Sequence, residues 1–214
     1  LGNGSIGASV IGLGTADACG PFTATVSPNT FTCANVGANT VIFTAADASG
    51  NSSTCSATVT VQDVVAPIVL CQAVTVQLNS AGNGSTTASA VNNGSTDACG
   101  IATTTLNNSN FTCANVAGPN TVILTVTDVN GNSSTCSATV TVQDNIAPVA
   151  ICQNLTINLG SSGSQTVLAS SIDNGSNDAC GIATTTLNPN TFTCDDLGVN
   201  NVTLTVTDVN TNSN

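Results

Sequence analysis

The fold is decided by the stretch GNSSTCSATVTVQD, which occurs at Gly50–Asp63 and again at Gly131–Asp144. In each copy apolar Ala and Val residues alternate with Ser and Thr, which is the period-2 pattern of a half-buried β-strand. Val74–Leu78 and Val202–Thr207 alternate in the same way, and Asp128–Asn132 is typical of a hairpin loop between two such strands. No window has the period of an amphipathic helix, so we expect strands throughout.

The sequence is an internal repeat with a period of about 81 residues, which suits a small independent domain better than one coil of a solenoid. The two copies of the deciding stretch begin at Gly50 and Gly131, and the string CGIATTTLN begins at Cys99 and, after the same interval, again at Cys180. We predict three domains: a partial repeat at 1–65 without its first strand, a complete repeat at 66–146, and a partial repeat at 147–214 without its last strand.

Six to seven short strands in about 81 residues predict a two-sheet sandwich of the immunoglobulin type. The expected fold class is therefore all-β, with tandem immunoglobulin-like β-sandwich domains stapled by disulfides. Consecutive repeats are joined through Val-Gln-Asp-x-x-Ala-Pro, at Val61–Pro67 and Val142–Pro148. Because proline fixes its own φ and restricts the residue before it, and no Gly-Ser spacer is present, we expect the domains to form a stiff rod.

The composition excludes several classes of protein. The 214 residues include eleven Asp but no Glu, Lys, Arg or His, so the formal net charge is −11. Without cationic side chains there is no surface that binds phosphates, which excludes nucleic acid as a partner. Without His, Lys, Tyr or Glu most general acid–base catalysis is missing, so we do not expect an enzyme. The longest apolar run, Val64–Cys71, is too short to cross a bilayer, so no membrane span is expected.

Ten cysteines point to an oxidising compartment outside the cell. The complete repeat holds Cys71, Cys99, Cys113 and Cys136, and the sequence alone does not choose among the three connectivities that four cysteines allow. Because the spacing of Cys99 and Cys113 recurs in the other repeats, we favour a disulfide between these two that closes a short loop. Cys71 on the first strand and Cys136 on the last strand would then form the second bond. Metal-binding thiolates are the alternative, although no close Cys-x-x-Cys pair is present. The predicted bonds are Cys19–Cys33, Cys71–Cys136, Cys99–Cys113 and Cys180–Cys194.

This pairing leaves Cys55 and Cys152 without partners. Cys55 belongs to a last strand whose first-strand partner would precede the sequence, and Cys152 belongs to a first strand whose partner would follow it. We expect the polypeptide to continue at both ends, or neighbouring chains to complete the terminal domains. In either case both cysteines should be oxidised in the native material.

Several motifs resemble those of a known family. The run Asp144–Cys152, the later Leu204–Asp208, and the Gly131-Asn132 turn that leads into Thr135-Cys136 are similar to a hyalin repeat module. More narrowly, they resemble the tandem cysteine-containing repeats of giant surface proteins in Bacteroidetes-like bacteria. The resemblance implies an immunoglobulin-like fold, a secreted or surface-anchored location, and an adhesive or scaffolding role.

Glycosylation is the first candidate modification. Asn154 and Asn201 fall on the polar phase of predicted strands, and the outward faces are rich in Thr, which offers O-linked acceptors. A bare polar surface is the alternative, because a chain rich in Asn, Ser and Thr forms acceptor triplets by chance. The ten Asn-x-Ser/Thr triplets begin at Asn3, Asn51, Asn83, Asn93, Asn107, Asn110, Asn132, Asn154, Asn174 and Asn201.

Calcium is the second candidate. Asp63 and Asp144 lie at the predicted junctions, where loops of the next module could add Asp97, Asp173 or Asp178. Carboxylate oxygens are the ligands that calcium prefers, and the sequence from Asp144 to the following Ala-Pro is similar to cadherin junctions, which hold calcium, although it is shorter in acidic residues. The alternative is that these carboxylates are solvated and cap turns.

These observations predict a structural segment of an extracellular stalk or filament, glycosylated, with a spacing, scaffold or adhesive role. The alternative is a cell-adhesion module that binds a ligand through its loops and has calcium-stabilised junctions. A ligand-binding module should have distinctive loops in one repeat, whereas the loop strings here recur almost unchanged. The expected partners are further copies of the same repeat, in the same chain or as head-to-tail neighbours, together with covalent glycans.

Overall fold

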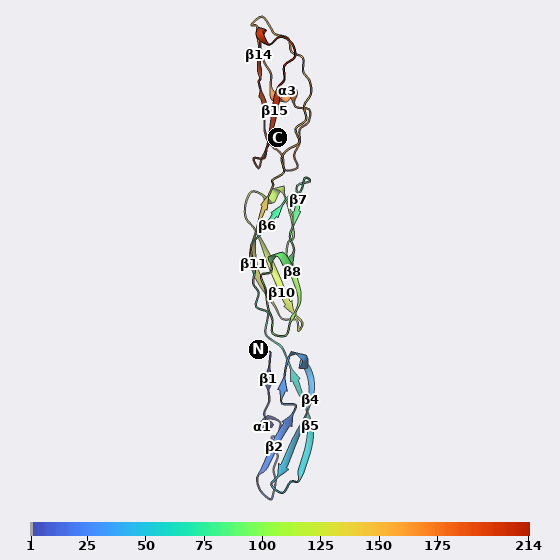
Figure 1. The fold of residues 1–214 in the computed structure, drawn as a ribbon. Coiled ribbons are helices and arrows are strands. Elements are labelled where there is room, and N and C mark those ends of the chain that lie inside the picture. The colour runs from blue at the N-terminus through green and yellow to red at the C-terminus, as the bar shows by residue number, and fades with distance from the viewer. Residues whose placement is uncertain (1) are drawn as a thin grey trace. The chain divides into compact units, whose positions relative to one another are not determined.

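The computed structural model describes residues 2–214 and is nearly all β, with 45% of residues in strands and 10% in helices (Figure 1). The predicted fold class, all-β with disulfide-stapled immunoglobulin-like sandwiches, is confirmed. No helix in the described range is long and apolar enough to cross a membrane. The short helices are therefore local features of a β-protein.

The chain forms two compact units, each of which takes part of the second repeat. Unit 1 contains the residues up to Cys71 together with Asn92–Thr105 and Leu124–Cys136. Unit 2 contains Gln72–Val91, Leu106–Ile123 and Ser137–Asn214. These limits differ from the domain boundaries predicted after residues 65 and 146, which stay a prediction.

The second repeat contains two sheets. The larger has the order β6-β11-β10-β8, and in the smaller β7 pairs with β9. Strand β11 runs parallel to β6, with Val140 opposite Val74 and Val142 opposite Val76. Val76, Val140 and Val142 are buried, as the alternating pattern predicts. The strands are β6 (Val74–Gln77), β7 (Asn83–Ser85), β8 (Ile101–Leu106), β9 (Asn110–Thr112), β10 (Asn120–Asp128) and β11 (Ser133–Gln143).

The first repeat has an antiparallel sheet of the order β2-β4-β5 and a small pair, β1 with β3. Its core is made of Val26, Phe31 and Val41, against which the partly buried Val59 and Val61 of β5 pack. The deciding stretch of the sequence therefore forms a strand with one apolar face. The strands are β1 (Gly4–Ser5), β2 (Phe22–Ser27), β3 (Thr30–Phe31), β4 (Gly37–Asp47) and β5 (Ser52–Val61).

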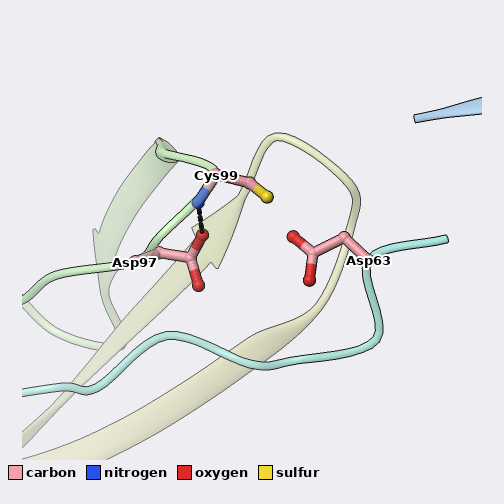
Figure 2. Close-up of side chains that lie close together, drawn as sticks. All are labelled: Asp63, Asp97 and Cys99. Carbon is pink, nitrogen blue, oxygen red and sulfur yellow. Dashed lines mark hydrogen bonds between the residues drawn. The ribbon is translucent and has the colours of Figure 1, made fainter. Parts of the chain in front are cut away.

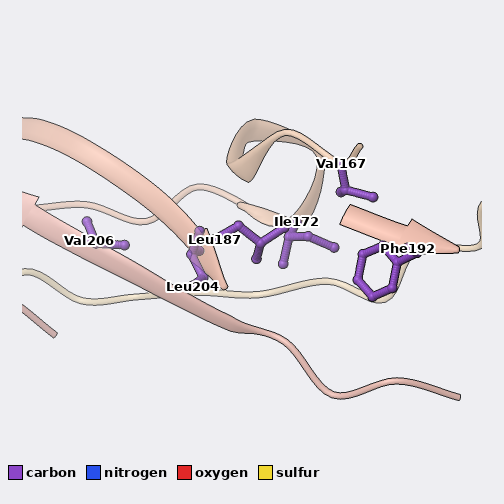
Figure 3. Close-up of a cluster of buried hydrophobic side chains, with 6 residues drawn as sticks. All are labelled: Val167, Ile172, Leu187, Phe192, Leu204 and Val206. Carbon is purple, nitrogen blue, oxygen red and sulfur yellow. The ribbon is translucent and has the colours of Figure 1, made fainter. Parts of the chain in front are cut away.

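The third repeat is built from two strand pairs, β13 with β15 and β12 with β14. Figure 3 shows Leu187 and Leu204 packed beside Ile172 in the middle of its core, with Phe192 next to Val167 at one end. The strands are β12 (Ser164–Thr166), β13 (Ile182–Asn188), β14 (Thr191–Thr193) and β15 (Thr203–Asp208).

One side of the third core is open. A cavity of about 450 Å³ lies beside it, lined in part by Leu155, Ile157, Phe192 and Val202. The strand predicted around Asn154 does not form. In the second repeat the equivalent strand β6 pairs with β11, and the described part of the third repeat contains no strand equivalent to β11, so the segment lacks a hydrogen-bonding partner.

Single helical turns interrupt the strands, and the sequence did not predict them because four residues are too few to show a helical period. Three are α-helical: α1 (Ala8–Ile11), α2 (Ala88–Val91) and α3 (Ala169–Ile172). Three are 3₁₀ turns: η1 (Cys33–Asn35), η2 (Cys113–Asn115) and η3 (Cys194–Asp196). Each 3₁₀ turn is closed by a capping box and begins with a cysteine, so the turns fix the positions of three sulfur atoms.

Candidate functional site at the repeat junctions

One disulfide bond crosses each of the two junctions between repeats. Cys33 is bonded to Cys99, and Cys113 to Cys180, each with a Cα–Cα distance of 5.1 Å. In both bonds the first cysteine begins a 3₁₀ turn of one repeat. The second follows an Asp-Ala pair and lies just before β8 or β13 of the next repeat. The chain is therefore covalently closed across both junctions.

The predicted bonds Cys19–Cys33, Cys99–Cys113 and Cys180–Cys194 are wrong. A disulfide requires Cα atoms within about 7 Å, but a strand separates the two cysteines of each predicted pair, for example β2 in the first repeat and β13 in the third. A six-residue strand spans about 20 Å, so such cysteines are held apart.

The bond between Cys71 and Cys136 is present, with a Cα–Cα distance of 6.0 Å, and it ties the start of the second repeat to β11. The remaining cysteines of the described chain are free and exposed. Cys55 and Cys152 have no partner, which matches the sequence prediction, whereas Cys19 and Cys194 were expected to be bonded. Cys19 and Cys194 are the repeat equivalents of the junction cysteines, so each free thiol has the position of one half of a junction bond.

A turn held by an aspartate positions the second cysteine of each junction. The Oδ1 atom of Asp97 accepts hydrogen bonds from the backbone N–H of Cys99 at 2.7 Å and of Gly100 at 3.1 Å. Asp178 accepts from the backbone N–H of Cys180 at 2.7 Å in the same way. A side-chain oxygen that accepts from the backbone two residues later is the usual Asx turn.

Each junction also brings two carboxylates together. Figure 2 shows the side chain of Asp63, from the linker, facing Asp97 and Cys99. A carboxylate oxygen of Asp63, one of Asp97 and the sulfur of Cys99 all lie within 4.8 Å of one another, and Asp144, Asp178 and Cys180 form the equivalent group. Because both sulfurs are in disulfide bonds, they are not thiolates, and the carboxylates are the metal ligands that remain.

Four of the five aspartates predicted as calcium ligands thus pair at the junctions, and Asp173 does not join them. The carboxylate of Asp173 accepts a hydrogen bond from the backbone N–H of Ser176 at 2.9 Å. Hydrogen bonds from the side chain and backbone of Ser176 hold the pKa of Asp173 below its usual value, against the opposing effect of burial. Asp173 is therefore a turn residue.

One oxygen in each pair is buried without a hydrogen bond. The Oδ1 atoms of Asp63 and Asp144 accept from the backbone N–H of Val65 and Ile146, both at 3.1 Å. The Oδ2 atoms of Asp63 and Asp144 are buried and have no partner, and the Asp144 residue is only 6% exposed. Since the sequence contains no Lys, Arg or His, no side chain can compensate these charges.

The hairpin loop predicted from the sequence is attached to the linker. The carboxylate of Asp128 accepts hydrogen bonds from the backbone N–H of Asn130 and Asn132 and from the side-chain amide of Asn132, each at 2.8 Å. Burial raises the pKa of Asp128, but these hydrogen bonds together with one from Gly131 outweigh it and hold the pKa below its usual value. The same Asn132 amide also donates to the backbone oxygen of Asp63 at 3.1 Å.

The second junction repeats this arrangement with other residues. Asp208 accepts from the backbone N–H of Asn210 and Asn212 and from the Asn212 amide, each at 2.8 Å. The Asn212 amide donates to the backbone oxygen of Asp144 at 3.1 Å. The sequence signal for both loops is the Asp-x-Asn-x-Asn spacing, although nothing in it reveals the contact with the linker.

Nine of the ten glycosylation triplets have an exposed asparagine. The exception is Asn132, which is half-buried and whose amide makes the two hydrogen bonds described above, so a sugar there would break them. Asn154 is exposed but does not lie on a strand, and Asn201 precedes β15. The strand-face placement predicted for these two residues is therefore wrong, while their exposure leaves them accessible.

The comparisons with known proteins give little further information. The sequence matches no protein-family model, including that of the hyalin repeat, and none of the curated proteins. Among solved structures, the chain is similar to a protocadherin gammaB7 EC3-6 cis-dimer structure, with 16% identity and a TM-score of 0.30. The match covers 90% of this chain and 57% of the protocadherin chain. This chain therefore spans little more than half the length of the protocadherin chain. A likeness this distant carries no functional argument.

Proposed function

We propose that this chain is a segment of an extracellular scaffold in which consecutive β-sandwich repeats are locked end to end and hold a fixed length as a spacer or stalk. The observation that supports it is the pair of bonds Cys33–Cys99 and Cys113–Cys180, which close the chain across both junctions. A second covalent link at each junction restrains the angle and the separation of its neighbours.

The bonds also shield most of the chain from a pulling force. A force applied at the two ends passes through Cys33 to Cys99 and then from Cys113 to Cys180, and so bypasses the intervening segments of 66 and 67 residues. The two bypassed segments need not unfold for the ends to resist extension. In a protein with this arrangement only the remaining part of the chain can lengthen under load.

The location outside the cell is supported by the disulfides, which persist in oxidising environments. The resemblance to hyalin repeats of bacterial surface proteins points the same way. We infer that sugars cover the surface at the exposed acceptor triplets, because they would keep a Thr-rich face without cationic residues soluble. Further copies of the repeat are the expected neighbours.

Single-molecule extension of the full chain, held by tags at its two ends, tests the proposed function. With the junction bonds intact, both bypassed segments, of 66 and 67 residues, stay out of the extended path. At about 3.5 Å per residue, full reduction should therefore lengthen the extended chain by about 470 Å. Bonds within repeats, as the sequence first suggested, would hide less of the chain, and their reduction would add only about 330 Å. Those bonds would close loops of only 14, 65 and 14 residues along the chain, with the Cys99–Cys113 loop inside that of Cys71–Cys136.

The two outcomes differ by about 140 Å, which single-molecule extension resolves. A variant with Cys19 and Cys194 replaced by alanine is the matched control, since these thiols are free. It should behave as the wild type does. An oxidised chain that extends as far as the reduced one would contradict the proposal, because the junctions would then bear no load through sulfur.

A further inference from the structure

We propose that the carboxylate pair at the second junction, Asp144 with Asp178, binds a calcium ion, and that the equivalent pair at the first junction, Asp63 with Asp97, binds another. Binding does not require that the chain bear load. The ion would occupy the space between the linker and the turn that carries the junction cysteine.

The carboxylates of the second junction lack a compensating charge. One oxygen of Asp144 and one of Asp178 lie within 4.8 Å of each other, where two negative charges repel. Asp144 is only 6% exposed, and its Oδ2 atom is buried without any hydrogen bond. A buried charge without a partner is costly, and the chain has no cationic side chain to offer. A cation from solution would supply the compensation that the chain's own side chains do not.

The ligand atoms select a hard divalent cation. Carboxylate oxygens suit calcium and magnesium, whereas zinc in proteins favours thiolates and imidazoles, which this site lacks. Calcium accepts six to eight oxygens in flexible geometry, so water can complete a shell that starts from two carboxylates. Magnesium demands a near-ideal octahedron and sheds water reluctantly, so we assign calcium. Sites of this kind in extracellular modules have Kd values of roughly 10⁻⁴ to 10⁻³ M.

The ion would join parts of the chain that the sulfur bond also joins. Asp144 lies just after β11, in the linker of the second repeat. Asp178 holds the turn of Cys180, which is bonded to Cys113. A cation bound to both carboxylates would therefore restrain the linker against the turn and stiffen the junction next to its disulfide.

A calcium titration of the oxidised, ¹⁵N-labelled full chain, followed by amide NMR at constant ionic strength, tests the proposal site by site. The amides of Ile146 and Cys180 donate to the two carboxylates, so their resonances report on the second junction. The amide of Cys19 donates to Asp17 in the same type of turn, at 2.6 Å, but Asp17 belongs to no metal-ligating group found among residues 2–214. Cys19 is therefore an internal control.

We expect the Ile146 and Cys180 resonances to shift with one saturable midpoint of roughly 10⁻⁴ to 10⁻³ M, while Cys19 stays in place. Asp178→Asn should raise that midpoint at least tenfold and leave the first junction unchanged. Asp17→Asn removes the same charge from the equivalent turn and should change neither junction. Both substitutions keep an oxygen that can accept the turn hydrogen bond, and the amide spectrum shows directly whether each variant is folded.

Three results would overturn the proposal. If Cys19 shifts with the same midpoint as Cys180, the chain only gathers counterions. If no resonance at the junction moves up to about 10 mM calcium, the site does not exist at the strength expected of extracellular modules. If magnesium gives the same midpoint as calcium, the assignment to calcium is wrong. The extension experiment is read from bond connectivity, so either proposal can fail while the other holds.

Discussion

Removing the second junction disulfide, by replacing Cys113 and Cys180 with alanine, should destabilise the fold by about 4 kcal/mol. The bond closes a segment of 67 residues, and no shorter covalent route joins the two cysteines. In the chain-entropy treatment, a loop of this length lowers the entropy of the unfolded chain by about 15 cal/mol/K. Multiplied by the temperature at 25 °C, that entropy gives the expected free energy.

Guanidinium unfolding followed by far-ultraviolet circular dichroism measures the effect, since the chain has no Trp or Tyr to give a fluorescence signal. The matched control replaces Cys19 and Cys194, which have the same places in their repeats but are free. The control should unfold at the wild-type midpoint, and the C113A/C180A variant well below it. Equal midpoints for wild type and C113A/C180A, or a clear loss in the control, would refute the assigned connectivity.

Three further results are expected. Leu124→Ala, at a residue that is 0% exposed, should cost about 2–5 kcal/mol in the same unfolding assay, whereas Val199→Ala, at 99% exposure, should be nearly neutral. The pKa of Asp128 is lowered in the folded state, so its ionised form stabilises the fold at any pH above the unfolded pKa of about 3.9. This stabilisation is lost as the pH falls through the lowered pKa of the folded state. Unfolding midpoints measured from about pH 6 to about pH 2 should therefore fall more steeply in the wild type than in Asp128→Asn. A peptide with the β11 sequence, whose cysteine is activated as a mixed disulfide with glutathione, should fill the open side of the third core. The Cys152 thiol should then displace glutathione and form a disulfide with the peptide, an adduct that mass spectrometry would detect.

Much of the fold could be predicted because strand alternation and turn chemistry are local. The deciding stretch forms β5 and β11, and the Asp128–Asn132 loop connects β10 to β11. The strand expected around Asn154 could not be judged locally, because a strand forms only where a neighbour accepts its hydrogen bonds. Single helical turns such as α2 also escape a periodicity argument.

The candidate site was predicted in part. Asp63 and Asp144 each lie in a linker between two repeats, so their meeting with the turn aspartates of the next repeat could be anticipated. The junction disulfides could not, because the regular spacing of Cys99 and Cys113 recurs whether cysteines pair within a repeat or between repeats. The signal that separates the two cases is the strand that lies between the cysteines of each predicted pair, such as β2 or β13.

The most direct measurement is a non-reducing peptide map after cleavage before aspartate, since trypsin has no Lys or Arg to cut. Cleavage releases the peptides 17–46, 97–127 and 178–194, each with two cysteines. The junction bonds Cys33–Cys99 and Cys113–Cys180 predict that all three are joined into one species, which separates on reduction. Three separate peptides, each closed by its own internal bond, would contradict the claim that sulfur locks one repeat to the next.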